Sequence, residues 1–470
     1  MNITPAVAID DPNLLGKGFA GESWTRWRAI LKAAYAEPLD DEERALFREV
    51  AAREPPRRRV RELWVIAGRR SGKDSIAAAI ATVAGMGDYE ESLRPGERAT
   101  IMCIASDRAQ AKIVHRYIKA NLTETPLLAP LVAKETEETI ELDNRTEVIV
   151  SANSYKAVRG RAIIVAIFDE VAFWRDESSA TPDVETYNAI EPSLATLPGA
   201  MLIGISSPYR RSGLLFERWT RFYGKDDDDV LVVRGASRLF NPTLPQSLID
   251  RALERDPDAA AAEWLAQWRA DIADFVSREV VEAVVPHGVF ERAPQRGRIY
   301  CGFADPSGGS SDSMTLAIAH LDDDGVARLD ALREVRPPFS PEAVVAEFAA
   351  TLRTYGLSRV QGDRYAGEWP RERFAVHGIQ YETADRPKGD MYRDALPLLN
   401  SGKVWLLDHP RLVAQLCGLE RRTSRGGRDS IDHRPGEHDD VANAAVGALL
   451  HAKVPPPQPA RWTRHRFFER

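Results

Sequence analysis

The sequence predicts an α/β protein built from two successive units, the first of them a doubly wound, mainly parallel sheet. Between Glu62 and Gly224, short apolar runs alternate with amphipathic segments, the pattern of a parallel sheet covered by helices on both faces. The apolar runs are rich in β-branched residues and nearly continuous, as expected of strands that are buried on both sides. A second series of strands and helices begins near Arg298, after a charged interruption at 225–229.

The first unit is expected to occupy the N-terminal half of the 470 residues, a length that suits about two to four domains. Residues 1–60 predict helices that extend this unit, and residues 61–225 predict its core. The expected strands of the core are LWVIA, ATIMCIA, TEVIVSA, AIIVAIF and AMLIGIS. The run Asp226–Asp229 predicts a solvated loop, and residues 226–295 as a whole predict a linker or small connecting subdomain.

The second unit is expected to span residues 296–453. It opens with three expected strands, IYCGFAD, MTLAIAHL and VARLDALREV, and the short turns between them indicate an antiparallel start. The helix PEAVVAEFAATLRTYG and the strand LSRVQGD follow. Residues 454–470 are proline-rich, then basic and aromatic, and are expected to stay flexible until they meet a partner.

The composition indicates a folded protein outside the membrane and the secretory pathway. Hydrophobic residues make up 44% and charged residues 28%, and no apolar stretch reaches the length of a membrane span. The N-terminus lacks the features of a secretory signal, so we expect a cytosolic setting. Cys103, Cys301 and Cys417 are too scattered for a zinc site and are expected to be buried thiols. The net charge of −7 excludes a globally basic nucleic-acid coat, but a local basic surface can still bind DNA.

A glycine-bounded turn between the strand LWVIA and the following helix predicts a phosphate-binding loop. Its residues are Gly68, Arg69, Arg70, Ser71, Gly72, Lys73 and Asp74. Backbone N–H groups and the helix N-terminus face an anion at such a turn, and Lys73 is placed to reach the outer phosphates of a nucleotide. The loop is one residue shorter than G-x-x-x-x-G-K-[ST], and Asp74 replaces the magnesium-binding hydroxyl, with Ser75 as a substitute. The alternative is a basic turn before a helix.

Two acids end the apolar strand AIIVAIF, which lies downstream of this loop. In nucleotide hydrolases such a strand brings one acid to the magnesium shell, here Asp169, and the next acid, Glu170, polarises the attacking water. Buried carboxylates at a strand end require a metal ion or hydrogen-bond donors. The alternative is a strand end whose acids lie in solvent. The pair is therefore a candidate for the catalytic acids of a nucleotide hydrolase.

Hydroxyl groups and arginines complete the candidate nucleotide site. Ser206 and Ser207 end another apolar strand and are candidates for sensing the terminal phosphate, although a Ser-Pro turn explains them equally well. Four arginines are candidates for stabilising the charge of phosphoryl transfer. They are Arg69, which is the best placed, and Arg70, Arg159 and Arg161.

Acids at the ends of elements predict a metal-dependent site in the second unit. Asp305 and Asp363 end expected strands, and His438, Asp439 and Asp440 begin the helix VANAAVGALLHA. Magnesium or manganese needs such a cluster of oxygen ligands, and two ions can activate water and stabilise the leaving oxygen of a phosphodiester. Each residue has a structural alternative: a turn cap for Asp305, a strand end for Asp363, and a helix cap for Asp439 or His438.

An ordered series of motifs resembles the large subunit of tailed-bacteriophage terminases, the genome-packaging ATPase and nuclease. The resemblance extends from about Trp24 to Leu450 and rests on six segments. They are GRRSGKD, VRGRAIIVAIFDEVAFW, GISSPYRRSG, FADPSGGSSDSMTLAI, QGDRYAGEW and HDDVANAAVGAL. The series in this order is specific, whereas any single segment is weak.

The resemblance implies an N-terminal P-loop ATPase that binds ATP and Mg²⁺ and translocates double-stranded DNA. Within it, Lys73 is implied to contact phosphate, Asp169 to bind magnesium and Glu170 to act as the catalytic base. Arg69 matches the loop arginine proposed to act in cis on ATP, and Ser206 and Ser207 match the coupling motif. Asp74 departs from the family pattern, which leaves the magnesium shell open.

The resemblance also implies a C-terminal RNase H-like endonuclease that uses Mg²⁺ or Mn²⁺, with two ions. Asp305, Asp363 and Asp440 match its metal-binding triad, and Asp439 stays an alternative ligand. Family members are similar in forming a homo-oligomeric ring on the portal protein, with a small terminase subunit that recognises DNA. The implied location is the host cytoplasm and, transiently, the procapsid portal vertex. Two alternatives remain: a host-type helicase or repair translocase with a nuclease domain, and a DNA- and portal-binding scaffold with vestigial acids.

Overall fold

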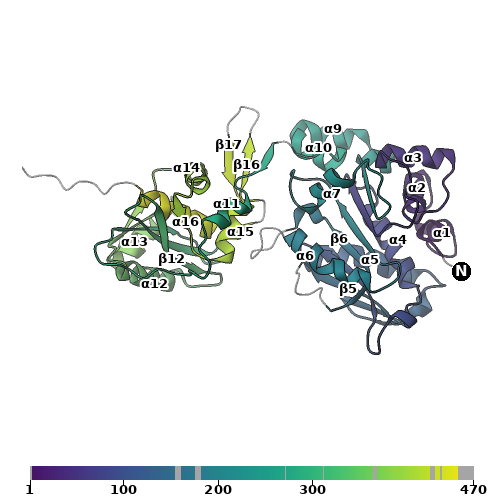
Figure 1. The fold of residues 1–470 in the computed structure, drawn as a ribbon, viewed down its shortest axis with the longest axis horizontal. Helices are drawn as coiled ribbons and strands as arrows, with labels where there is room; N and C mark the ends of the chain where they lie inside the picture. The colour runs from purple at the N-terminus through teal and green to yellow at the C-terminus, as the bar shows by residue number, and fades with distance from the viewer. Residues whose placement is uncertain are drawn as a thin grey trace, which may run out of the picture. The chain divides into compact units, whose positions relative to one another are not determined.

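The computed structural model describes residues 3–153, 160–174, 182–269, 271–310, 312–363, 368–423, 429–434 and 437–453. The chain divides into two compact units, Met1–Ala273 and Asp274–Arg470, each with its own hydrophobic core. Figure 1 shows helices around a sheet in each of them. Within the described ranges, no helix is both long and apolar enough to cross a membrane.

The first unit is built on a sheet of order β3-β4-β5-β2-β6-β7-β1-β8. Its strands are β1 (Glu62–Ala67), β2 (Ala99–Ala105), β3 (Val132–Glu135), β4 (Thr139–Leu142), β5 (Thr146–Ala152), β6 (Ala162–Asp169), β7 (Met201–Ser206) and β8 (Val230–Gly235). In this spatial order, the neighbouring strands β5, β2, β6, β7, β1 and β8 pair in parallel, whereas β3 and β4, and β4 and β5, pair antiparallel. The predicted mainly parallel sheet and its five expected strands are confirmed.

The first unit contains helices that come before β1 in the sequence, helices that alternate with its strands and helices that follow β8. They are α1 (Pro5–Asp10), α2 (Thr25–Ala34), α3 (Asp41–Ala51), α4 (Lys73–Gly85), α5 (Arg108–Glu124), α6 (Pro182–Ile190), α7 (Leu214–Phe222), α8 (Ser237–Phe240), α9 (Gln246–Arg255) and α10 (Pro257–Leu265). The Ala-rich helix α4 is buried along almost all of its length, because small side chains let it pack closely from all sides. Helix α3 begins with a capping box between Asp40 and Glu43.

The segment 226–295, expected to be a linker or small connecting subdomain, contains β8, α8, α9 and α10 and the start of the second unit. Strand β8 pairs with β1 along its whole length, because VLVV is a buried apolar run like those of the other core strands. Helices α9 and α10 also belong to the first unit, while residues from Asp274 onward belong to the second.

The acidic run is tied to the basic run that precedes β1. The Asp228 carboxylate accepts from the Arg57 backbone N–H at 2.9 Å, and Asp229 pairs with Arg58 at 2.8 Å. The Asp229 carbonyl also accepts from the Glu62 backbone N–H. The predicted loop is therefore present, and its charges are partly satisfied by a neighbouring segment as well as by solvent.

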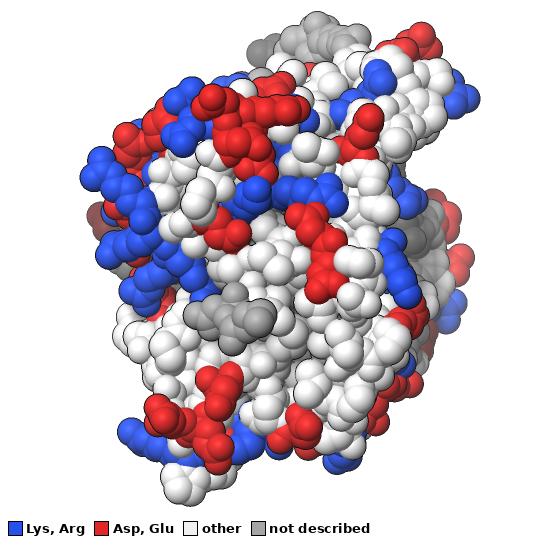
Figure 2. Space-filling view, turned by 90° about the vertical axis from the view of Figure 1, so that its right-hand side faces the viewer, with Lys and Arg blue, Asp and Glu red and all other residues white. Residues whose placement is uncertain are grey.

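Basic and acidic side chains are mixed on the surface of the N-terminal helices. Figure 2 shows Lys and Arg interspersed with Asp and Glu on the face that it presents. Ion pairs on α2 and α3 join Arg26 to Glu49 and Lys32 to Glu43. This face therefore carries side chains of both charges.

The second unit is built on a sheet of order β14-β13-β10-β11-β12-β15, with a small sheet β17-β16-β9. The strands are β10 (Tyr300–Asp305), β11 (Met314–Leu321), β12 (Ala327–Val335), β13 (Arg359–Gly362), β14 (Gln380–Thr383), β15 (Val404–Trp405), β16 (Glu420–Thr423) and β17 (Asp429–Asp432), and β9 (Ile272–Asp274) includes the boundary between the units. The predicted antiparallel start is confirmed by the pairings of β10, β11 and β12. Strands β13 and β14 then add in parallel beside β10, which is the arrangement of an RNase H-like fold.

Six helices complete the described part of the second unit. They are α11 (Arg278–Ala283), α12 (Pro341–Thr354), α13 (Trp369–Val376), α14 (Lys388–Asn400), α15 (Pro410–Gly418) and α16 (Asp440–Ala452). Helix α16 packs against β10, β11 and β12, and Gly447 permits the close approach. A Cβ atom at Gly447 would lie 2.4 Å from the Phe303 ring. The N-terminus of α16 is thereby held near the end of β10.

Candidate active sites

The phosphate-binding loop joins β1 to α4, as predicted. Gly72 has a φ of +91°, and a Cβ atom there would lie 2.9 Å from the Trp24 ring. A Cβ atom at Gly68 would lie 2.7 Å from the Trp264 carbonyl oxygen, so both ends of the loop require glycine. The Trp27 indole N–H donates to the Ser71 carbonyl at 2.9 Å and fixes the middle of the loop.

Lys73 is buried at the start of α4 and forms an ion pair with Glu170. Its Nζ lies 2.9 Å from Glu170 Oε1, and its exposed fraction is only 5%. Burial opposes the charge of Lys73, but the carboxylates of Glu170 and Asp74 outweigh it and raise its pKa. The residue expected to reach the outer phosphates and the residue expected to polarise the attacking water are therefore in direct contact.

Glu170 is held by β7 as well as by Lys73. Its Oε2 accepts from the Ser206 hydroxyl at 3.1 Å and from the Ser207 backbone N–H at 3.2 Å. Strand β7 lies between β6 and β1, which places these serines between the two acids and the loop. Glu170 itself has a φ of +49°, a left-handed conformation that is uncommon outside glycine and is often found at functional sites.

Asp169 ends β6 in a buried position with an exposed fraction of 2%. Its Oδ2 accepts from the Gln110 side chain at 3.0 Å, while its Oδ1 has no hydrogen-bond partner among the described residues. Asp74 Oδ1 is likewise buried without a partner there. Burial, followed by the negative charges of Asp74 and Glu170, raises the pKa of Asp169 to about 8. Burial also raises the pKa of Asp74. Two unsatisfied carboxylate oxygens next to a phosphate loop fit a magnesium ion.

A cavity of about 690 Å³ opens beside the loop. Its lining includes Arg69, Arg70, Lys73, Asp74, Ser75, Gln110, Tyr117, Phe173, Glu170, Ser207 and Glu263. The Arg69 guanidinium donates to Glu263 on α10 at 2.8 Å and is more than half exposed. Arg161 instead pairs with Glu147 at 3.0 Å and does not line the cavity. Arg159 lies outside the described residues. Of the four candidate arginines, the structure brings Arg69 and Arg70 to this site.

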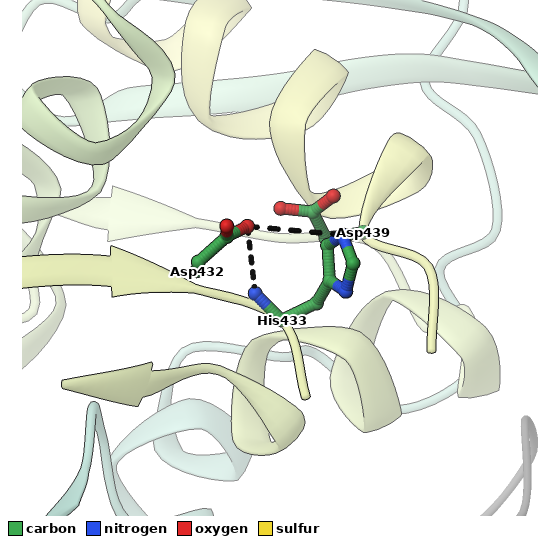
Figure 3. A group of neighbouring side chains, drawn as sticks. All are labelled: Asp432, His433 and Asp439. Carbon is green, nitrogen blue, oxygen red and sulfur yellow. Dashed lines mark hydrogen bonds and ion pairs between the residues drawn. The ribbon is translucent and has the colours of Figure 1, made fainter. Parts of the chain in front are cut away.

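The second unit contains two neighbouring groups of acids. Figure 3 shows the first group, Asp432, His433 and Asp439, whose ligand atoms lie within 4.8 Å of one another. The Lys388 ammonium is already among them, 2.9 Å from Asp432 and 3.0 Å from Asp439. A metal ion in this group would compete with a cation that the chain itself supplies.

Asp439 is buried, and both of its carboxylate oxygens have partners. Lys388 Nζ lies 3.1 Å from Oδ1, and the Tyr392 hydroxyl donates to Oδ2 at 2.8 Å. Lys388 and Tyr392 are one turn apart on α14, so they reach Asp439 from the same side. Burial opposes the charge of Lys388, but Asp439 and Asp432 raise its pKa above the usual range. The Lys388 ammonium thus compensates the negative charge of the Asp439 carboxylate.

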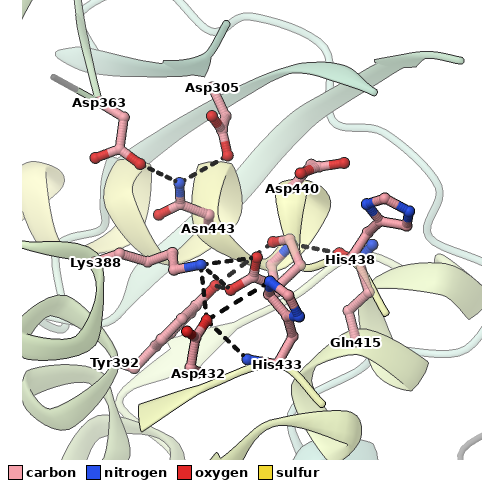
Figure 4. Close-up of polar contacts among 12 residues, drawn as sticks. Asp305, Asp363, Lys388, Tyr392, Gln415, Asp432, His433, His438, Asp440 and Asn443 are labelled. Carbon is pink, nitrogen blue, oxygen red and sulfur yellow. Dashed lines mark hydrogen bonds and ion pairs between the residues drawn. The ribbon is translucent and has the colours of Figure 1, made fainter. Parts of the chain in front are cut away.

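The second group contains Asp305 and Asp363, at the ends of the adjacent parallel strands β10 and β13. The Asn443 side-chain N–H₂ on α16 donates to both of them, at 2.8 Å each (Figure 4). Burial raises the pKa of Asp305 well above its usual value, although the Asn443 hydrogen bond opposes the shift and the Asp363 charge adds to it. The Asn443 Oδ1 has no partner among the described residues.

Asp440 belongs with this second group. Its charge acts on Asp305, and burial raises the pKa of Asp440 to about 6. The Ser313 backbone N–H donates to Asp440 Oδ2 at 3.1 Å, and the Thr315 hydroxyl donates to its carbonyl at 2.8 Å. Ser313 in turn donates to Glu334 on β12. The structure therefore joins Asp305 and Asp363 through Asn443 and places Asp440 on the same helix as Asn443, while Asp439 contacts Lys388 and Tyr392.

His438 does not contact the metal-binding candidates directly. Its Nδ1 lies 3.2 Å from Asp312 Oδ1, and its side chain is partly exposed. Beside the helix-cap alternative, His438 therefore has a contact with Asp312 in the turn that follows β10.

Several residues of both sites are missing from the sequence-based expectations. Asn443 could have been found, because it lies three residues after Asp440 on the same face of a helix. Gln110 follows the end of β2, the strand next to β6, and its position at that sheet edge was also a usable signal. Lys388 and Tyr392 carry no local signal, because their role depends on how α14 packs beside α16.

Comparisons with known proteins return likenesses of structure. No protein-family model and no curated protein matches the chain. The large terminase of bacteriophage HK97 is 17% identical with a TM-score of 0.43, covering 95% of this chain and 100% of that one. The large terminase of a thermophilic bacteriophage, solved in complex with ATP-gamma-S, is 13% identical with a TM-score of 0.39, covering 91% and 98%. The large terminase nuclease of the thermophilic phage G20c with bound magnesium is 20% identical with a TM-score of 0.30, covering 34% and 84%. The chain is similar to each of these at low sequence identity.

Proposed function

We propose that the chain is a terminase large subunit, an ATP-driven motor for double-stranded viral DNA joined to a metal-dependent endonuclease. The observation that carries the proposal is the presence of two separate carboxylate centres, one in each unit. The first lies beside a phosphate-binding loop. The second lies at the strand ends of an RNase H-like sheet. The ordered series of motifs in the sequence agrees with this function.

In the motor unit, the loop from Gly68 to Asp74 would hold the phosphates of ATP. Lys73 would exchange its contact with Glu170 for the outer phosphates, because both are anionic partners of one ammonium. Glu170 would then be free to accept a proton from the attacking water. Ser206 and Ser207, which donate to Glu170, would respond to a change in the position of its carboxylate. Asp169 would hold Mg²⁺, which neutralises the phosphate charge when bound. Arg69 would leave Glu263 to reach the phosphates.

In the nuclease unit, Asp305, Asp363 and Asp440 would hold the metal. Mg²⁺ or Mn²⁺, as one or two ions, supplies activation of water and stabilisation of the leaving oxygen. Because Asp439 is fully paired with Lys388 and Tyr392, its proposed role is to position the start of α16 rather than to bind metal. Asn443 would orient the Asp305 and Asp363 carboxylates.

The proposal includes the boundaries and the partners of the protein. We place the motor in residues 1–273 and the nuclease in residues 274–453. Proposed partners are double-stranded DNA, the portal protein, a small terminase subunit and further copies of this chain in a ring. The proposed location is the host cytoplasm and the procapsid portal vertex. The tail 454–470 lies outside the described residues and is proposed as a DNA or portal contact.

Two assays on the full chain test the function. Plasmid nicking with Mn²⁺ should be present in the wild type and lost in Asp305→Ala, but retained in Asp323→Ala, an exposed acid of the same unit. ATP hydrolysis should fall by roughly two to four orders of magnitude in Glu170→Ala because the base is lost, while nucleotide binding persists. The exposed Glu254→Ala on α9 should leave hydrolysis unchanged.

The same assays separate the alternative functions. A scaffold with vestigial acids predicts ATP hydrolysis without nicking in the wild type. A helicase or repair translocase predicts strand separation of a forked duplex, whereas a packaging motor predicts movement along an intact duplex without unwinding. Normal hydrolysis by Glu170→Ala would remove this residue from the mechanism.

A further inference from the structure

Asp74 and Asp169 form a pair of acids with buried oxygens beside the phosphate loop. Asp74 lies in the first turn of α4, directly after Lys73, and Asp169 ends β6. Each carboxylate has a buried Oδ1 that lacks a hydrogen-bond partner among the described residues. The exposed fraction of Asp169 is 2%, so water does not satisfy it from bulk solvent. A buried carboxylate oxygen requires a hydrogen-bond donor or a cation, and both of these oxygens lack a donor among the described residues.

The direct ion-pair contacts of the cations at the site are made with other acids. The Lys73 ammonium contacts Glu170 at 2.9 Å, and the Arg69 guanidinium contacts Glu263 at 2.8 Å. Gln110 donates to Asp169 only at Oδ2, and its amide is neutral. Hence neither free oxygen has a hydrogen-bond partner within the described part of the chain, although the charge of Lys73 acts on both carboxylates. Carboxylate oxygens are the ligands that Mg²⁺ and Mn²⁺ prefer.

We propose that Asp74 and Asp169 together bind one divalent cation before any nucleotide arrives, with Asp74 as a direct ligand. This inference deepens the proposed ATPase function and rests on it. A serine or threonine at position 74 would offer a neutral hydroxyl, and such a site depends on the phosphates to supply most of the charge that attracts magnesium. Two carboxylates match the charge of a divalent cation by themselves.

The same arrangement sets the order of binding. An ionised Asp74 at the start of α4 repels incoming phosphates unless a cation lies between them. The bound cation therefore completes the phosphate site, so that metal binding precedes nucleotide binding. With a hydroxyl at position 74, this electrostatic barrier disappears and the nucleotide no longer requires a preloaded metal.

Titration with Mn²⁺, followed by electron paramagnetic resonance, tests the inference on the full chain. The nuclease centre is first silenced by Asp305→Asn and Asp363→Asn, so that its metal binding does not interfere. In this background and without nucleotide, we expect one Mn²⁺ to bind. Asp74→Ser and Asp74→Asn should each weaken this binding at least about tenfold, because one charged ligand is lost. The exposed Asp143→Asn should leave it unchanged.

Addition of ATP separates the possible outcomes. Asp74→Ser should regain Mn²⁺ binding when ATP is present, because the hydroxyl and the phosphates then share the ion. The inference is overturned if the wild type binds no Mn²⁺ without nucleotide, or if Asp74→Ser binds Mn²⁺ equally well. In either case, Mg²⁺-dependent ATP hydrolysis by the wild type would still support the proposed function. If the chain neither binds nor hydrolyses ATP, the proposed ATPase function falls, and the inference falls with it.

Discussion

Asn443 donates both of its side-chain N–H groups to acids that come from different strands. Asp305 and Asp363 are each 2.8 Å from its Nδ2, and the residue has an exposed fraction of 1%. Two carboxylates that share one donor repel each other, and the amide is the neutral group that bridges them. Asp305 and Asp363 would also be ligands of a divalent cation, whose charge would reduce the same repulsion.

Asn443→Leu should therefore destabilise the protein more without metal than with it. In EDTA we expect a loss of about 1–3 kcal/mol in the free energy of unfolding, because two acids lose their donor. In Mn²⁺ the charge of the cation would reduce the repulsion between the acids, and the loss should shrink. Urea unfolding in the two buffers measures both values. Asn121→Leu, which removes a hydrogen bond to Thr82 in the first unit, should cost the same in each buffer. Equal losses for Asn443→Leu would contradict the bridging role.

Asp439 and Asp440 illustrate what local sequence leaves undecided. Both are acids at the start of one helix, and both suit a metal ligand or a cap by residue type. Their roles are separated by tertiary neighbours, since Asp439 meets Lys388 and Tyr392 while Asp440 lies near Asp305. Neighbouring residues of a helix point about 100° apart, so only the packing of α14 and β10 decides which one faces the acids.

Among the elements, the buried strands were predictable and the short polar ones were not. The runs that became β1, β2, β5, β6 and β7 are continuous and apolar, because a strand covered on both faces has little room for polar side chains. Strands β3 and β4 read VAKE and TIEL and lie at the sheet edge. Four mixed residues carry no clear period, so such edge strands escape pattern reading.

Helix α16 supplies a prediction at the scale of one element. In an open helix, Gly→Ala stabilises by up to about 1 kcal/mol, because glycine loses more backbone entropy on folding. At Gly447 the sign should reverse, since the added methyl group meets the Phe303 ring. We expect Gly447→Ala to destabilise by about 1–3 kcal/mol through overpacking. It should also lower nuclease activity, because α16 carries Asp440 and Asn443.

Urea unfolding and plasmid nicking measure both effects. The double variant Gly447→Ala with Phe303→Leu offers a matched test, because the smaller side chain makes room for the methyl group. Its loss of stability should be less than the sum of the two single losses. Strict additivity would show that the helix and β10 do not meet at this pair.

At the scale of the whole molecule, two units with separate cores predict two unfolding transitions. A ligand that binds one folded unit raises the transition of that unit alone. ATP-gamma-S with Mg²⁺ should shift the transition of the first unit in a chain with the nuclease acids replaced by asparagine. Mn²⁺ should shift the transition of the second unit when Asp169 is replaced by asparagine. Calorimetry of the full chain measures both shifts.

Lys73→Ala provides the control for the first shift, because it removes the ammonium that we propose to bind the phosphates. A single transition that responds to both ligands would show that the two units unfold together. The sequence indicated two α/β units, with a linker or small connecting subdomain expected at 226–295, from the charged run that precedes β8. Pairing between Asp228 or Asp229 and the segment before β1 is a long-range contact, and charge patterns along one chain do not reveal it.

The contact between the N-terminal helices and the phosphate loop has a spectroscopic consequence. Trp24 lies against Gly72, and the Trp27 indole N–H bonds to Ser71, so two natural fluorophores touch the loop. The emission of an indole depends on its hydrogen bonding and on nearby charge. Arrival of a nucleotide, or of a cation before it, would therefore be visible as a change of intrinsic fluorescence without any attached dye. Trp24 and Trp27 would thus serve as natural fluorescent probes of the loop.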